Sequence, residues 1–292
     1  MVRVFKRIVY ILFFALSFLF SSDNYWQQSV NYKMNVILID SVRQLACSSI
    51  ITYKNNSPDK LNEIYLHLYP NAFQLGSVKT RDYLNGYGSN SRSSYFRDEL
   101  DGYQSKIHVR EFTIAKDQNI VIDNYKINDT VLRANLKSAI LPGEEVRIDI
   151  KWNHHIGGMV ERAGYYEGQY NMAQWYPKIA VYDDRGWHAE PFHAQGEFYG
   201  EFGRFDVEFE LPEKFIIGAS GVVDSGDPGW EMVRVDTSAD FDDWFSLFEE
   251  DYKEPELTKN RKVRFVAENV HDFAWVASPN FLYEHDIYDG ID

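Results

Sequence analysis

The chain has 292 residues, of which 45% are hydrophobic and 16% aromatic, so it can build a sizeable core and is not a disordered segment. Its formal net charge of -14 argues against nucleic acid as a partner, because binding to phosphates requires a basic surface. The single cysteine, Cys47, excludes an intramolecular disulfide, and we interpret it as a small buried hydrophobic residue.

The N-terminus has the order of a secretory signal. Basic residues at positions 3, 6 and 7 precede an almost uninterrupted apolar run from Ile8 to Phe20, and two serines follow it. This run is shorter than the roughly 20 residues that a helix needs to cross a bilayer. The pattern therefore predicts a cleaved signal peptide at 1–22 and an exported protein, periplasmic or extracellular. An uncleaved membrane anchor is the alternative.

Beyond this segment, the dominant pattern is a period of two. The segments 146–152 and 205–211 alternate apolar with charged residues, which predicts half-buried strands. Residues 65–69 and 261–267 predict one further strand each, and 119–135 predicts two short strands around a polar turn, with Gly- and Pro-containing turns between the segments. The many aromatic residues favour the same structure, because their rings pack well on a pleated surface.

Short strands with frequent turns predict an all-β domain, either a large twisted antiparallel sheet or a β-sandwich. Two polar stretches, Gly76–Tyr103 and Asp240–Asn260, lack periodicity and are expected to be irregular. We expect one β domain at 23–275 and the start of a linker at 276–292. The sequence ends without a closing strand or cap, so we expect it to continue into a further domain.

Candidate metal ligands are few. The sequence contains no HExxH motif, in which two His one helical turn apart hold zinc and the Glu activates water. The nearest cluster is His188, Glu190 and His193, but a proline within it forbids a regular helix, and loop spacing fixes no geometry. The pair His154-His155 points to opposite faces of a strand. We therefore expect no metal ion in this chain.

Nucleophilic chemistry has no clear motif either. Ser220 is the serine nearest to a nucleophile elbow, but its Gly-Ala-Ser-Gly-Val surroundings do not match Gly-x-Ser-x-Gly, and they are typical of a turn. Acidic residues are numerous, and no pair stands out as a general acid and base. A free-standing hydrolase with carboxylate catalysis remains one hypothesis.

The densest aromatic stretch runs from Gln169 to Asp183 and contains Trp175, Tyr176 and Pro177. Rings beside Gln, Asn and Lys fit two interpretations, a platform for a peptide or carbohydrate and a surface that packs on another domain. Packing is the interpretation that the sequence favours.

Several motifs follow one another in the order of a known family. They are Glu63–Phe73, Gln174–Asp183, Gly186–His188, Gly196–Tyr199, Phe202–Val207, Ile217–Gly221 and Asn269–Trp275. They resemble bacterial members of the membrane alanyl aminopeptidase (gluzincin) family of zinc metallopeptidases, and the match as a whole covers roughly residues 30 to 285.

The resemblance implies a saddle-shaped β-sandwich that leans, as an N-terminal domain, on a thermolysin-like catalytic domain. That second domain would carry HExxH and zinc beyond Asp292, so this chain is expected to have no cofactor and to be inactive alone. The family's N-terminal domain supplies a Gln or Glu that holds the free amine of a peptide substrate, and Gln169 and Gln174 are the candidates. Trp175, Tyr176 and Pro177 are the expected docking surface for the catalytic domain.

The resemblance therefore predicts the N-terminal substrate-side domain of an exported aminopeptidase-like protein. Its expected partners are a catalytic domain, in the same or a separate chain, and a peptide. The alternative is a stand-alone secreted β-sandwich that binds peptides or carbohydrates.

Overall fold

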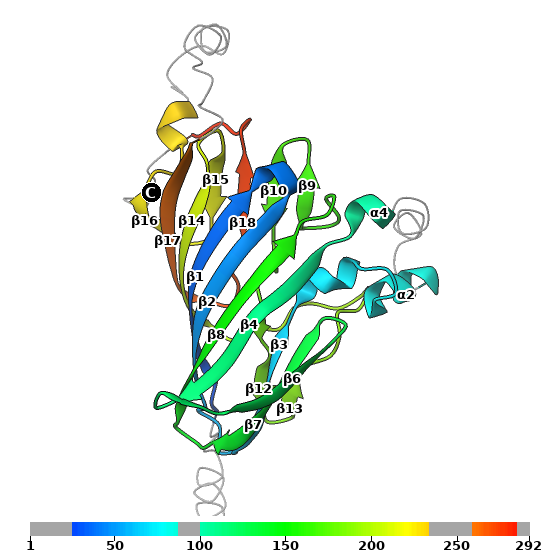
Figure 1. Ribbon diagram of the computed structural model, residues 1–292, viewed down its shortest axis with the longest axis vertical. Coiled ribbons are helices and arrows are strands. Elements are labelled where there is room, and N and C mark those ends of the chain that lie inside the picture. Colours follow the sequence, from blue (N-terminus) through cyan, green and yellow to red (C-terminus); the bar gives the residue numbers. More distant parts are fainter. Residues whose placement is uncertain (1–24, 87–99, 234–258, 285–292) are drawn as a thin grey trace, which may run out of the picture.

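The computed structural model describes residues 25–86, 100–233 and 259–284 (Figure 1). The expected signal peptide at 1–22 lies outside these ranges, as does nearly all of the acidic stretch 240–260. Among the described residues, no helix is long and apolar enough to cross a membrane.

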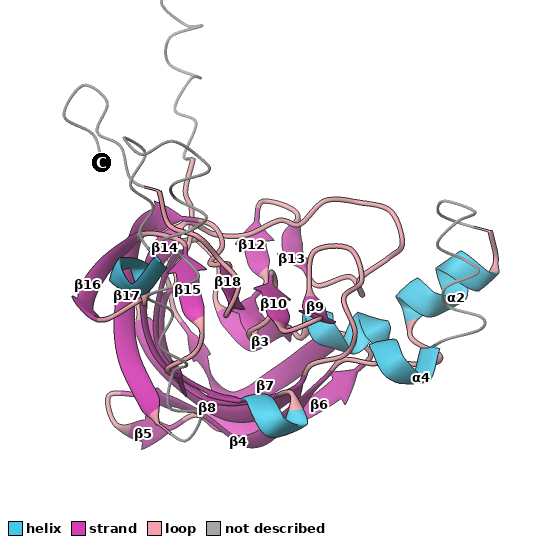
Figure 2. Ribbon diagram, turned by 90° about the horizontal axis from the view of Figure 1, so that it is seen from above, coloured by secondary structure: helices cyan, strands magenta, loops and turns pink. Residues whose placement is uncertain are grey.

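A curved eight-stranded sheet forms the outer layer of the molecule (Figures 1 and 2). Its strands, in spatial order, are β16 (Val222–Gly226), β17 (Asn260–Val270), β14 (Gly203–Pro212), β1 (Ser29–Ile39), β2 (Gln44–Lys54), β8 (Glu145–His155), β4 (Lys106–Lys116) and β5 (Asn119–Ile120). The all-β prediction is confirmed, and the alternating segments 146–152 and 205–211 lie inside β8 and β14.

Smaller sheets lie on the concave side of this layer (Figure 2). One contains β15 (Ile216–Ala219), β18 (Trp275–Ser278), β10 (Gln169–Met172) and β9 (Gly164–Tyr166). Another contains β11 (Lys178–Ile179), β3 (Leu61–His67), β7 (Val131–Ile140) and β6 (Ile122–Asn128), and a two-strand ribbon pairs β12 (Val181–Asp183) with β13 (Gly186–His188). Strand β18 extends to Ser278, past the end expected at residue 275.

One strand pair of the large sheet is parallel. Strand β1 pairs antiparallel with β2 on one side and parallel with β14 on the other, where Val30 lies opposite Gly203. A Cβ on Gly203 would lie 1.9 Å from the carbonyl oxygen of Val30, so only glycine allows the two backbones to approach this closely. The sheet is therefore mixed rather than purely antiparallel, with its other pairs antiparallel.

Helices occupy part of the stretch that we expected to be irregular. Within Gly76–Tyr103, α2 (Val78–Leu84) begins after Ser77, whose side chain accepts a hydrogen bond from the Thr80 amide as an N-cap. Helix α4 (Leu100–Tyr103) closes the same stretch. The prediction missed them because both are too short to show a helical period. The 3₁₀ turns are η1 (Asp40–Val42), η2 (Tyr69–Phe73) and η3 (Trp230–Val233).

The core between the layers is rich in aromatic rings. Trp152 on β8, Trp175 and Trp275 on β18 are fully buried, and their rings lie 6.2–6.4 Å apart from centre to centre along the series. The indole nitrogen of Trp175 donates a hydrogen bond to the carbonyl oxygen of Phe273, at 3.0 Å. A buried Trp whose N–H is satisfied in this way adds apolar contact without an unpaired polar group.

The expected docking surface at Trp175, Tyr176 and Pro177 is therefore wrong. Trp175 and Tyr176 have no exposed surface and Pro177 is buried. The sequence could not distinguish a surface that faces another domain from one that faces this chain's own sheet, because both have the same composition. In the fold, these rings fill the space above the concave face of the large sheet.

One carboxylate is buried close to this core. Glu201 is 5% exposed, and the backbone amides of Gln28 and Tyr182 hydrogen-bond to it. Burial has the larger effect and raises the pKa of Glu201 to about 7. The folded chain therefore holds this proton at pH values where the unfolded chain has lost it.

We expect Trp175→Ala to lower the free energy of unfolding by about 3–5 kcal/mol, because it leaves a cavity among buried rings. Phe202→Ala is the control, since Phe202 is 51% exposed, and its loss should cost about 1 kcal/mol or less. Urea denaturation measures both. Equal effects for the two variants would contradict the buried position of Trp175.

The raised pKa of Glu201 predicts a pH dependence of stability. As pH rises from about 4.5 to about 7, the unfolded chain releases this proton before the folded chain does, so the free energy of unfolding falls. Glu201→Gln removes this loss and should be more stable than wild type at pH 8 by about 1–3 kcal/mol. Glu167 is exposed, so Glu167→Gln should show the same pH dependence of stability as wild type. Urea denaturation from pH 4 to 8 tests this, and identical profiles for wild type and Glu201→Gln would refute it.

Candidate functional site

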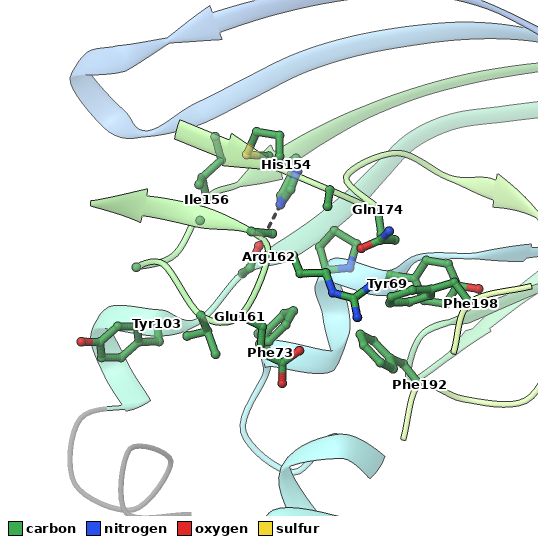
Figure 3. Close-up of a pocket in the computed structure, with 18 residues that line it drawn as sticks. Tyr69, Phe73, Tyr103, His154, Ile156, Glu161, Arg162, Gln174, Phe192 and Phe198 are labelled. Atoms are coloured by element: carbon green, nitrogen blue, oxygen red, sulfur yellow. Dashed lines mark hydrogen bonds between the residues drawn. The ribbon is translucent and has the colours of Figure 1, made fainter. Parts of the chain in front are cut away.

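A pocket opens where η2 and the end of β8 meet two loops, 157–164 and 192–198 (Figure 3). It holds about 510 Å³, including its open mouth. Most of its wall is apolar. The side chains that define it include Tyr69, Phe73, Tyr103, His154, Ile156, Glu161, Arg162, Met172, Gln174, Phe192 and Phe198.

Three aromatic rings form one wall. Tyr69 on η2 lies 4.7 Å from Phe198 and 5.6 Å from Phe192 between ring centres, and Phe192 lies 4.8 Å from Phe198. All three contacts are edge to face, the arrangement that ring quadrupoles favour. His67 stacks behind Tyr69 at 4.6 Å and stays neutral, because burial lowers its pKa to about 4. The wall suits an apolar side chain of a ligand.

A tight turn brings Glu161 to the pocket. The amide of Val160 donates to the carbonyl of Ala163, and Glu161 at the tip has a positive φ of 59°. Its carboxylate accepts a hydrogen bond from Tyr83 at 2.6 Å and forms an ion pair with Lys79 at 2.7 Å. Lys79 is 1% exposed. Lys79 therefore largely neutralises the negative charge of Glu161.

His154 and Ser105 form a pair that resembles a nucleophile and its base. The Nε2 atom of His154 lies 2.8 Å from Ser105 Oγ, but that hydroxyl also lies 3.1 Å from the carbonyl oxygen of His155, to which it can donate its single proton. Burial lowers the pKa of His154 to about 3, which makes it a weak base at neutral pH. The arrangement favours a structural hydrogen bond over nucleophilic chemistry.

Of the two candidate amine anchors, Gln174 lines the pocket. Its backbone φ is 50°, in the left-handed region, and a residue other than glycine adopts this conformation at a cost of about 1 kcal/mol. Its side-chain nitrogen donates to Asp272 Oδ2 at 2.9 Å. Gln169, on β10, instead donates to Asn171 Oδ1 at 2.8 Å and is not among the residues that line the pocket.

The two histidines of the segment 186–193 have separate partners. His188 Nε2 lies 2.8 Å from Asp183, and His193 Nδ1 lies 2.8 Å from Asp82 on α2. Each imidazole thus has its own carboxylate partner. Within the described ranges, no three His, Cys, Asp or Glu side chains lie close enough together to hold a metal ion.

Sequence reasoning missed several residues of the site. Glu161 and Phe192 come from loops without a period, and Asp272 reaches Gln174 from 98 positions away in the chain. Only the three-dimensional fold brings them together. A usable signal was the cluster of Gly157, Gly158 and Gly164, because a Cβ at any of them would lie within 2.7 Å of another part of the chain.

No protein-family model matches the sequence, and neither does any curated protein. Among solved structures, the fold is similar to the M1 zinc metallopeptidase from Deinococcus radiodurans, with a TM-score of 0.42 and 11% identity over 86% of this chain and 41% of that one. For a mutant of that enzyme bound to a Tyr-Ser-Ala substrate, the TM-score is 0.43 and the identity 11%, over 86% of this chain and 42% of that one.

A two-domain M1 zinc metallopeptidase mutant bound to L-tryptophan also matches, with a TM-score of 0.43 and 11% identity over 87% of this chain and 43% of that one. The chain thus spans less than half the length of these metallopeptidase chains. At these TM-scores the likeness assigns no activity to it.

We expect Glu161→Gln to lower the free energy of unfolding by about 2 kcal/mol or more, because it takes the carboxylate away from the buried ammonium of Lys79. Glu111→Gln is the matched control. Glu111 pairs with Lys151 at 2.9 Å, but both side chains are more than half exposed, so the loss should be about 0.5 kcal/mol. Lys79→Met added to Glu161→Gln should recover part of the stability. Thermal unfolding measures all three, and a double variant no more stable than Glu161→Gln would argue against a buried charge as the cause.

Proposed function

We propose that the chain is the N-terminal, substrate-side domain of an exported, aminopeptidase-like zinc metallopeptidase. In this proposal the zinc and the HExxH motif belong to a catalytic domain outside the printed sequence, in the same chain or a separate one. Residues 1–292 contain no HExxH motif, so they would bind the substrate and would not hydrolyse it. The order of motifs from Glu63 to Trp275, which resembles the aminopeptidase family, supports the proposal.

The observation that carries the proposal is the position of Gln174. A polar amide lines a mainly apolar pocket, and its backbone adopts a conformation that costs free energy. Such local strain persists where the surrounding structure enforces it, and it is often found at functional sites. A mainly apolar pocket with a few polar groups suits the first residue of a peptide, whose side chain is buried while its amino group is hydrogen-bonded.

The substrate would thus be a peptide with a free N-terminus. Its first side chain would contact the rings of Tyr69, Phe192 and Phe198, and its ammonium group would face Gln174. Glu161 would add little direct attraction, because Lys79 and Tyr83 already occupy its carboxylate oxygens. The amine contact is therefore expected to depend mainly on Gln174.

Binding of small probes tests this proposal. We expect L-tyrosinamide, which has a free amine, to shift NMR signals of Gln174, Phe192 and Phe198, whereas N-acetyl-L-tyrosinamide should bind at least tenfold more weakly. Gln174→Ala should reduce the affinity for L-tyrosinamide about tenfold, the value of one hydrogen bond to a charged group. Alanine has a comparable backbone cost at this φ, so the variant should fold.

The control is Gln169→Ala, which removes an amide that lies outside the pocket and should leave the affinity unchanged. Equal affinities for the free and acetylated probes would refute an amine site. Carbohydrate binding at the same residues, without binding of the amine probe, would instead support a stand-alone binding module.

A further inference from the structure

A single carboxylate, Asp272, lies behind Gln174 in the loop that joins β17 to β18. Its Oδ2 atom accepts a hydrogen bond from Gln174 Nε2 at 2.9 Å. Its Oδ1 atom accepts from the hydroxyl of Tyr176 at 2.9 Å and from the amide of Phe273 at 2.8 Å. The Nζ atom of Lys178, a buried side chain, lies 3.6 Å from Oδ2. Every group around this carboxylate is a donor.

This arrangement fixes the orientation of the Gln174 amide. An ionised carboxylate can only accept hydrogen bonds, so the NH₂ end of the amide must face Asp272 and the oxygen must face away. In Figure 3 the side-chain oxygen of Gln174 is drawn on the pocket side of the amide and the nitrogen on the opposite side. The hydrogen bonds of the described residues give this oxygen no partner.

The carboxylate also changes the strength of that oxygen as an acceptor. A donor N–H that is polarised by a negative charge pushes electron density toward the carbonyl end of the same amide, so hydrogen bonds in series strengthen each other. The pocket thereby receives part of the negative character of Asp272. A full charge in the aromatic wall would carry a desolvation cost, which the neutral amide avoids.

We infer that Asp272 is the positioning residue that turns the acceptor end of Gln174 toward the pocket, and that the position in front of this amide thereby favours a primary ammonium group over a carbonyl or carboxylate oxygen. The ligand class rests on the function proposed above, whereas the orientation of the amide rests on the geometry alone. Asp272 acts through Gln174 and is not itself among the residues that line the pocket.

The unmodified chain offers the first test. A scalar coupling across the hydrogen bond, between the side-chain nitrogen of Gln174 and the carboxyl carbon of Asp272, should be detectable by NMR. The amide protons of Gln174 should also exchange with solvent more slowly than those of Gln169, the matched control, which donates to the neutral amide of Asn171. Absence of the coupling together with fast exchange would overturn the inference.

Three variants separate positioning from simple stabilisation. In Asp272→Asn the side-chain oxygen should stay on the donors Tyr176 and Phe273, so its NH₂ faces Gln174 and turns that amide the other way, and the affinity for L-tyrosinamide should fall at least fivefold. Tyr176→Phe removes another hydrogen bond to Asp272 and should preserve the slow exchange of the Gln174 amide. The double variant Asp272→Asn with Gln174→Glu restores a defined pair, because Asn can donate to one oxygen of Glu and leave the other facing the pocket.

The double variant should regain at least wild-type affinity for L-tyrosinamide, an outcome that a purely structural role of Asp272 does not predict. Unchanged affinity in Asp272→Asn, or no recovery in a folded double variant, would overturn the inference. If Asp272→Asn does not fold, the coupling in the unmodified chain still decides the orientation. A wild-type chain that shows the coupling but binds no amine probe would support the orientation and refute the proposed function.

Discussion

The carboxylate of Asp272 is the point on which the arrangement of core and pocket depends. Its side chain is 18% exposed, and a carboxylate that is partly removed from water needs hydrogen-bond donors around it, since an unpaired charge would be costly. Gln174 and Tyr176 donate to it from one short segment, to which Lys178 adds a positive charge 3.6 Å away, and Phe273 donates from the loop of Asp272 itself. This requirement holds the 174–178 segment against the loop before β18, so that Trp175 and Tyr176 enter the core while Gln174 stays at the pocket.

Residues 174–178 contribute both to the pocket and to the core. Strand β10 ends at Met172, the backbone of Gln174 is left-handed, and β11 begins only at Lys178. Between these strands the chain turns, so that Gln174 lines the pocket while Trp175 and Tyr176 lie in the core. The pocket wall is thus attached directly to the aromatic core, and a change in core packing at Trp175 would move the adjacent amide.

The fold class was predictable from the sequence because it depends on a local pattern. Alternation at 146–152 and 205–211 fixes which side chains face the core, and such strands need no knowledge of their partners. The sheet order was not predictable, because the partners of β1 depend on a strand far along the chain. Of the pocket, Gln174 was one of two glutamines that the resemblance singled out and the sequence could not choose between them, whereas Glu161 and Phe192 come from loops whose positions only the whole fold determines. The exposed role expected for Trp175 was wrong because aromatic composition does not tell which surface the rings cover.

The parallel pairing of β1 with β14 also affects how the molecule can form. Strands β1 and β2 are joined by a short turn and can form a hairpin early, but the other edge of β1 pairs with a strand that begins at Gly203. As a chain emerges N-terminus first, that edge stays open until most of the domain has been made. Contacts between segments so distant in sequence slow folding, and an open strand edge invites pairing with other chains. Efficient production of this protein therefore depends on shielding the edge of β1 until β14 arrives.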